Sequence, residues 1–205
     1  MELFLDNDII LKLSSANLLE KIETIFDSTS SSIYILPTAK SYISKSKRVL
    51  TKYRQNTIKE ALKIISNYQT IPDSYVDQNK FIKLSKIEGI DSGEQLLYSL
   101  TPSSEDFLIL TGDKVSITAL NKSSVISSLQ KYFKNKIVCL EQILINLIRS
   151  EGFTDIKNNI EKSNFCGDDK TIKICFNQTD AVESDVTNCL DSYISDLKKQ
   201  APNLF

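Results

Sequence analysis

Short apolar runs alternate along this chain with longer stretches in which apolar residues recur at helical spacing. The apolar runs occupy residues 3–6, 33–36, 107–111 and 137–140. Runs of this length separated by helical segments are typical of parallel strands with helices packed on both faces of the sheet. We therefore predict an α/β fold with three α/β/α layers and a mainly parallel sheet.

The segments between the apolar runs predict helices. Pro37 suits a helix start because its missing N–H is not needed there, and Pro102 marks a helix end. Further helical segments are expected between the third and fourth apolar runs, up to Phe133. The other helices that we expect span residues 16–26, 38–68 with at most one break, 81–84, 91–100 and 141–148.

The chain changes character near Gly152. Residues 1–150 carry 19 Lys and Arg against 16 Asp and Glu, whereas residues 151–205 carry 6 against 10. We interpret residues 1–150 as the main domain and residues 151–205 as an acidic elaboration packed on it. Within this elaboration, residues 171–176 predict a strand and residues 180–199 a helix.

Three acidic signatures fall at one end of the predicted sheet. LFLDND at residues 3–8 and FLILTGDK at 107–114 are apolar runs that end in acid, so Asp6 and Asp113 should enter the crevice at the carboxyl ends of the strands. GIDSGEQLL at 89–97 begins a helix that would bring Glu94 to the same crevice. Clustered carboxylates in a chain without histidine suit a hard cation such as Mg²⁺ or Mn²⁺. The missing histidine also excludes Ser-His and Cys-His nucleophile pairs.

Each signature also has a purely structural interpretation. Asp6 and Asp8 could cap the helix after the first strand. Asp91 and Glu94 have the spacing of a capping box, and Asp113 could be an ordinary turn residue. The metal interpretation gains weight because close carboxylates repel one another unless a cation neutralises them.

The order and the residue types of these signatures resemble those of the PIN-domain family of metal-dependent ribonucleases over residues 1–150. In that family an acid ends the first strand, a second lies in a D-x-G-E helix start, and a third follows an apolar strand in a T/S-x-D turn. The matching positions are Leu5, Asp6, Asn7 and Asp8, then Asp91, Gly93 and Glu94, then Thr111, Gly112 and Asp113.

The resemblance implies a metal-dependent endoribonuclease that hydrolyses RNA phosphodiester bonds, including the toxin-type members of the family. Asp6, Glu94 and Asp113 would be the catalytic metal ligands, with Asp8 and Asp91 as auxiliary ligands. The relation to toxin components also suggests a protein inhibitor as a partner, and a homo-oligomer stays open.

Two other functional interpretations of the same residues remain open. The segment after the second strand, residues 37–42, lacks the acid that many family members carry, which leaves open a PIN-like binding module without activity. The chain also resembles the haloacid-dehalogenase phosphatases, with Asp6 as nucleophile and Asp8 as general acid in an Asp-x-Asp motif. In that interpretation residues 110–112 resemble the second motif and Gly167, Asp168 and Asp169 the metal-binding one.

A one-sided basic segment supports a nucleic-acid partner. Residues 40–63 hold eight Lys and Arg against the single acid Glu60. On a continuous helix five of them would form a stripe that could follow an RNA backbone, with Tyr42 and Tyr53 as stacking surfaces. The five are Lys45, Arg48, Lys52, Lys59 and Lys63.

Cysteine usage and the N-terminus bear on location. The four cysteines have no CxxC spacing and are too sparse for a disulfide scaffold, so we expect mostly buried, reduced thiols. The first residues are acidic where a signal peptide would be basic, and no apolar run approaches the ~20 residues of a membrane span. We therefore expect a cytoplasmic protein without a membrane partner.

Overall fold

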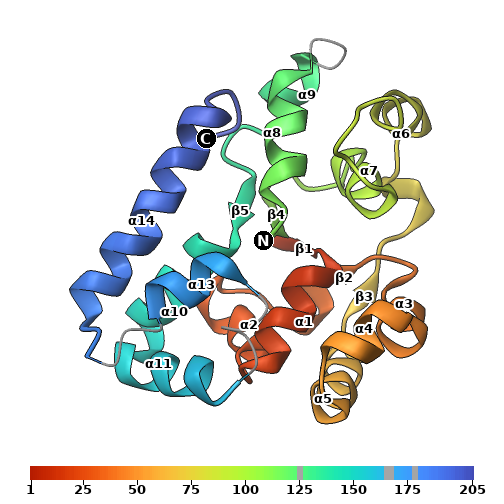
Figure 1. The fold of residues 1–205 in the computed structure, drawn as a ribbon. Helices are drawn as coiled ribbons and strands as arrows, with labels where there is room; N and C mark the ends of the chain where they lie inside the picture. Colours follow the sequence, from red (N-terminus) through yellow and green to blue (C-terminus); the bar gives the residue numbers. More distant parts are fainter. Residues whose placement is uncertain (124–126, 164–168, 177–179) are drawn as a thin grey trace.

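A five-stranded parallel sheet forms the centre of the molecule (Figure 1). The computed structural model describes residues 1–123, 127–163, 169–176 and 180–205. The strand order is β3-β2-β1-β4-β5 and every neighbouring pair is parallel. The strands are β1 Glu2–Leu5, β2 Ile33–Ile35, β3 Gln69–Thr70, β4 Phe107–Thr111 and β5 Ile137–Cys139.

The central strands are apolar because helices cover both of their faces. Leu3, Phe4 and Leu5 of β1 have no exposed surface, and Leu3 lies between Ile33 of β2 and Leu108 of β4 in the register. The four predicted strands are confirmed within about one residue. The fifth strand, β3, was not predicted because it is a short, polar and exposed pair of residues at the sheet edge.

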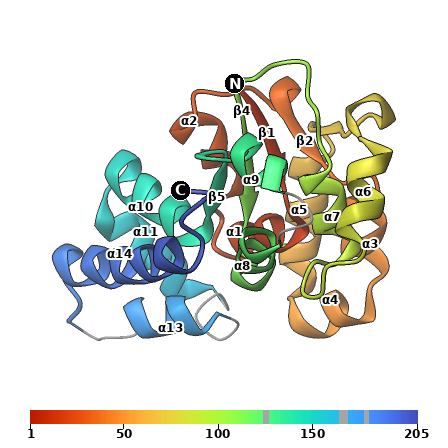
Figure 2. The same cartoon turned by 90° about the horizontal axis from the view of Figure 1, so that it is seen from above.

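Helices form layers on the two sides of this sheet (Figure 2). The connections from β1 to β2 and β3 run toward one edge, and those to β4 and β5 toward the other, so right-handed crossovers place α1–α5 and α6–α9 on opposite faces. The predicted three-layer α/β/α fold is therefore confirmed. The helices are α1 Asn7–Ser15, α2 Ile22–Ile25, α3 Ala39–Lys45, α4 Lys47–Lys52, α5 Gln55–Ile65, α6 Gln78–Leu84, α7 Ser92–Tyr98, α8 Lys114–Lys122 and α9 Ser127–Tyr132, with short 3₁₀ turns at Leu19–Lys21, Ser30–Ser32 and Asp73–Tyr75.

The helix predicted over residues 38–68 consists of three helices. Ser46 has an extended backbone between α3 and α4, and Tyr53 and Arg54 are extended between α4 and α5. Neither break contains glycine or proline, so the sequence gives no local signal for it. The helix predicted over residues 16–26 is likewise shortened, to the 3₁₀ turn Leu19–Lys21 followed by α2.

Among the residues that the structure describes, the regular secondary structure of the C-terminal part is entirely helical. It contains α11 Phe153–Lys162, α13 Lys170–Phe176 and α14 Glu183–Gln200, which follow α10 Leu140–Glu151. The strand predicted at residues 171–176 is wrong, because Thr171, Ile172, Cys175 and Phe176 are buried at helical spacing. The helix predicted at residues 180–199 is confirmed as α14, which packs against both α10 and α13.

A disulfide joins Cys175 of α13 to Cys189 of α14. The expectation of reduced cysteines is therefore wrong for this pair, because the two thiols meet only through the packing of two helices. Cys139 is a buried free thiol, and Cys166 lies outside the described residues. A lasting disulfide is typical of oxidising surroundings, so cysteine usage no longer supports a cytoplasmic location. Across the described residues, no helix has both the length and the apolar character needed to cross a membrane.

Candidate active site

The strand order reverses between β1 and β4, and the five predicted acids meet at the carboxyl ends of these two strands. In parallel α/β sheets such a reversal opens a crevice in which ligands bind. A pocket of about 580 Å³ occupies this position. Its lining includes Asp6, Asp8, Asp91, Glu94 and Asp113. The five acids that the sequence analysis singled out therefore line one pocket, together with Asp169.

Asp6 follows β1 directly and occupies the N-cap position of α1. Its side chain makes no capping hydrogen bond in the described structure, and the residue is only 9% exposed. Burial, followed by the nearby carboxylate of Asp8, raises the pKa of Asp6 to about 7. Asp91 and Asp113 push the pKa in the same direction. Asp6 is therefore a buried carboxyl whose surroundings favour its neutral form.

The capping box predicted from Asp91 and Glu94 is present. One oxygen of Asp91 accepts hydrogen bonds from the N–H groups of Gly93 at 2.8 Å and Glu94 at 3.0 Å. Glu94 Oε2 accepts in turn from the N–H of Asp91 at 2.7 Å. Burial raises the pKa of Glu94 to about 8, and the neighbouring Asp113 adds to this shift.

Asp113 caps the next helix, α8. Its Oδ1 accepts a hydrogen bond from the N–H of Ser116 at 2.9 Å, and its own N–H donates to Thr111 Oγ1 at 3.1 Å. These bonds use one carboxylate oxygen of Asp113, just as the capping box uses one oxygen each of Asp91 and Glu94. The structural and functional interpretations are thus compatible, because a carboxylate has a second oxygen with which it can bind a ligand.

A buried lysine that the sequence analysis missed lies beside these acids. Lys12 is 6% exposed, and its Nζ lies 2.6 Å from Asp8 Oδ2 and 2.7 Å from Asp169 Oδ2. Burial opposes its charge, but the two carboxylates raise the pKa of Lys12 above its usual range. A Cβ on Gly112 would lie 2.8 Å from Asp8 Oδ2, so glycine leaves room for this pair. The spacing of Asp8 and Lys12 by four residues could have suggested the contact, but nothing local points to Asp169.

A second lysine, Lys114 at the start of α8, is held by the C-terminal helices. It forms an ion pair with the buried Glu141 of α10 and donates a hydrogen bond to Thr171 Oγ1 of α13 at 3.1 Å. Its Nζ also lies 4.8 Å from the ring centre of Tyr193 of α14. Lys12 and Lys114 are therefore both fixed partly by residues beyond position 168.

The predicted basic stripe is divided by the breaks between the helices. Arg48 and Lys52 of α4 line the pocket together with Tyr42 and Tyr53. The other three predicted residues, Lys45, Lys59 and Lys63, do not appear among the residues that the structure places around it. Lys63 instead pairs with Glu60 on α5. A continuous stripe on one helix is therefore wrong. What remains at the pocket is a short basic and aromatic wall of Arg48, Lys52 and Tyr42, because Tyr53, expected as a second stacking surface, is only 7% exposed.

The chemistry of the pocket fits a hard divalent cation. Carboxylate oxygens are the ligands that Mg²⁺ and Mn²⁺ prefer. Burial and neighbouring carboxylates raise the pKa values of Asp6 and Glu94, and a bound cation would oppose this effect. In their present rotamers, however, no three His, Cys, Asp or Glu side chains of the described residues converge as a ready metal site. Binding a cation would therefore require these carboxylate side chains to move closer together.

The fold and the pocket define an α/β protein with a carboxylate-rich crevice at its strand reversal. Comparison of the chain with known protein families, with curated proteins and with solved structures finds no match. Any assignment of function must therefore depend on the chemistry of this pocket.

Proposed function

We propose that this protein is a Mg²⁺- or Mn²⁺-dependent ribonuclease that hydrolyses phosphodiester bonds in RNA. The observation that carries the proposal is the gathering of five carboxylates, two of them with raised pKa values, in one pocket that Arg48 and Lys52 also line. The resemblance of the same acids to the PIN-domain pattern supports this proposal.

The basic and the aromatic residues that line the pocket suit different parts of an RNA substrate. Arg48 and Lys52 are placed to attract backbone phosphates. The ring of Tyr42, which is only partly buried, could stack on an unpaired base, whereas Tyr53 is 7% exposed and packs in the core. A single strand fits such a wall better than a duplex because its bases are available for stacking.

Asp6, Glu94 and Asp113 would hold the metal ion, with Asp8 and Asp91 as auxiliary ligands. A metal bound there lowers the pKa of a bound water molecule and stabilises charge on the phosphate. Asp91, Glu94 and Asp113 each lie at a helix start and are oriented by a capping hydrogen bond. Lys12 neutralises Asp8 within the pocket.

The decisive experiment compares carboxylate variants on single-stranded RNA with Mg²⁺ or Mn²⁺. We expect Asp6→Asn and Asp113→Asn to lower metal-dependent cleavage at least about 100-fold, because each removes a ligand charge and keeps the shape. Asp196→Asn, which removes an exposed charge on α14, is the matched control and should cleave normally. If the parent protein cleaves no RNA with either metal but binds it, a binding module without activity is favoured.

A phosphatase of the haloacid-dehalogenase type is the second candidate. It gains support from Asp169, which shares the pocket with Asp6, although Gly167 and Asp168 of that motif lie outside the described residues. Against it, Asp8 is tied to Lys12, and Thr111 accepts a hydrogen bond from the N–H of Asp113. Such a phosphatase would hydrolyse small phosphate monoesters and form a beryllium fluoride adduct on Asp6. We expect neither result.

A further inference from the structure

The C-terminal wall of the pocket consists of Asp169 and α13, and it contacts the pocket through the two lysines. Asp169 Oδ2 bonds to Lys12 at 2.7 Å, and Thr171 Oγ1 accepts from Lys114 at 3.1 Å. Both contacts are sheltered, since Lys12 is 6% and Thr171 7% exposed. The wall thus determines where two positive charges lie inside a pocket otherwise rich in carboxylates.

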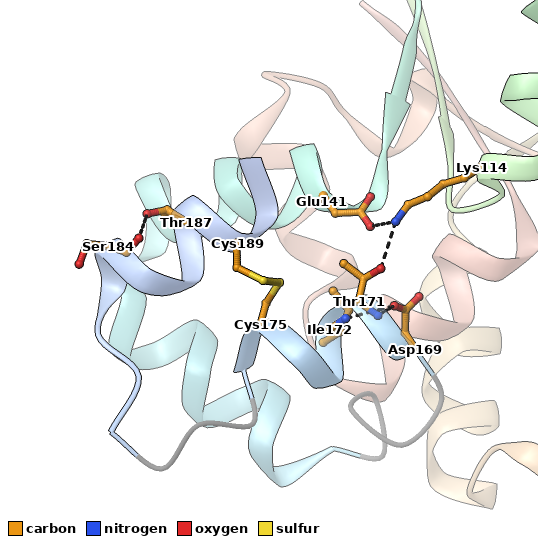
Figure 3. The surroundings of a disulfide bond; sticks show 9 residues. All are labelled: Lys114, Glu141, Asp169, Thr171, Ile172, Cys175, Ser184, Thr187 and Cys189. Carbon is orange, nitrogen blue, oxygen red and sulfur yellow. Dashed lines mark hydrogen bonds and ion pairs between the residues drawn. A yellow bond between two sulfur atoms is a disulfide. The ribbon is translucent and has the colours of Figure 1, made fainter. Parts of the chain in front are cut away.

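The wall is itself held by the disulfide (Figure 3). Cys175 lies at the far end of α13 from Asp169 and is bonded to Cys189 of α14. Helix α14 packs along α10, which supplies Glu141 to Lys114. Helix α13 is a single short helix of 7 residues, too short to be stable alone. Its position must therefore depend on its contacts and on this cross-link.

We propose that Asp169 and Thr171 are positioning residues of the pocket, and that the disulfide between Cys175 and Cys189 keeps them in place. Lys114 would then contact a substrate phosphate only while the wall is fixed, and Lys12 would stay paired with Asp8 and Asp169. Reduction of the disulfide loosens the wall and weakens substrate binding. The part of this inference that concerns substrate rests on the proposed function, whereas the part that concerns the wall does not.

The redox step is an ordinary exchange with a dithiol. The thiolate of the dithiol attacks the sulfur of Cys189, which is half-buried, whereas Cys175 is 4% exposed. The resulting mixed disulfide is resolved by the second thiol of the reagent. Two electrons and two protons end on Cys175 and Cys189 as thiols, and the dithiol leaves as a cyclic disulfide.

The first test measures hydrogen exchange of the backbone amides in the oxidised and the dithiol-treated protein. We expect faster exchange in residues 170–176 after reduction and no change in the sheet strands β1 and β4. The variant Cys175→Ser/Cys189→Ser should exchange like the reduced protein and should not respond to the dithiol. Equal protection of α13 in both redox states would overturn the inference, whether or not the protein acts on RNA.

Asp169→Asn separates the wall's contact with Lys12 from the capping of α13. Asp169 Oδ1 accepts from the N–H groups of Thr171 at 3.0 Å and Ile172 at 3.2 Å, and asparagine can keep these bonds. Its amide carries no charge for Lys12. We expect faster exchange in α13 with the disulfide intact, and Asp169→Glu should restore part of the protection. Unchanged exchange in Asp169→Asn would show that the contact with Lys12 positions nothing.

The second test measures RNA affinity as a function of salt. Reduction, or Thr171→Val, should weaken binding of single-stranded RNA roughly threefold, since one hydrogen bond that orients Lys114 is lost. The salt slope should fall by about one phosphate contact. Thr171→Ser keeps the hydroxyl and should bind normally. Equal affinity and slope in both redox states would overturn the inference while leaving the proposed function intact, whereas failure of the oxidised protein to bind RNA would reject the proposed function alone.

Discussion

The sheet and the C-terminal wall bring charged residues to the same pocket by different physical means. Asp6 and Asp113 lie there because β1 and β4 are largely buried neighbours, so the residues that follow them emerge side by side. Asp169 is held in the pocket by its ion pair with Lys12, by the nearby hydrogen bond between Thr171 and Lys114, and by the disulfide at the other end of α13. The local sequence pattern predicts buried apolar strands, but it does not predict cross-links between distant helices.

The largest effect should come from damage to the sheet. Phe107 of β4 is 1% exposed and packs against the rings of Phe4 and Phe133. We expect Phe107→Ala to lower the free energy of unfolding by about 3–5 kcal/mol, because it leaves a cavity in the core. Urea unfolding followed by circular dichroism measures this. A loss below about 1 kcal/mol would mean that the sheet core does not carry the stability that its burial indicates.

Removal of the disulfide should cost less. Cys175 and Cys189 are 14 residues apart, and closing a loop of this size stabilises a protein by about 3 kcal/mol through the unfolded chain. We expect Cys175→Ser/Cys189→Ser to lower the free energy of unfolding by about 2–4 kcal/mol. A dithiol should reduce the stability of the parent to that of the variant and leave the variant unchanged. A variant as stable as the oxidised parent would show that the wall is held by packing alone.

The two regions also differ in how far the sequence could predict them. Four of the five strands followed from apolar runs, and two of these runs lead to Asp6 and Asp113 in the shared pocket. Glu94 was expected in the same pocket from the helix start at residues 91–94. The strand predicted at residues 171–176 failed because an alternating apolar pattern also fits a short helix with one buried side.

Tertiary contacts explain what the sequence left out of the site. Lys12 is buried only because α1 packs under the pocket beside Asp169, 157 residues further along the chain. The helix breaks at Ser46 and Tyr53 leave only part of the predicted basic stripe at the pocket. No glycine or proline marks either break in the sequence. In each case packing between distant segments decides the outcome.

The third prediction concerns pH and belongs to the sheet side of the pocket. The pKa values of Asp6 and Glu94 are raised to about 7 and about 8. Between pH 4 and these values the folded protein binds more protons than the unfolded chain, so stability is greatest at low pH and falls as the pH rises. The metal-free protein should therefore be less stable at pH 8 than at pH 5, and Mn²⁺ should reduce the difference.

Asp6→Asn isolates the contribution of one group to this pH dependence. Asparagine resembles the protonated carboxyl, so the variant should lose about 1.4 kcal/mol less stability for each pH unit between pH 5 and 7. Thermal unfolding of both proteins across this range gives the slopes. Parallel slopes for parent and variant would mean that Asp6 is ionised in the folded protein and that no cation is needed to neutralise it.

The smallest effect should come from Arg48 and Lys52, the basic residues of α4 at the pocket. Changing them tests whether substrate binding depends on this part of the pocket as well as on the C-terminal wall. Arg48 and Lys52 line the pocket, whereas Lys59 and Lys63 lie on α5 and Lys63 pairs with Glu60. We expect Arg48→Gln/Lys52→Gln to weaken RNA binding a few-fold and to lower the salt slope by about two phosphate contacts. Lys59→Gln/Lys63→Gln removes the same charge from the same basic segment and is the matched control. Its slope should stay that of the parent, and folding of both variants should be unchanged because exposed charges contribute little to stability. If the two double variants weaken binding equally, RNA responds to the net charge of the segment, and the pocket wall has no special part in recognition.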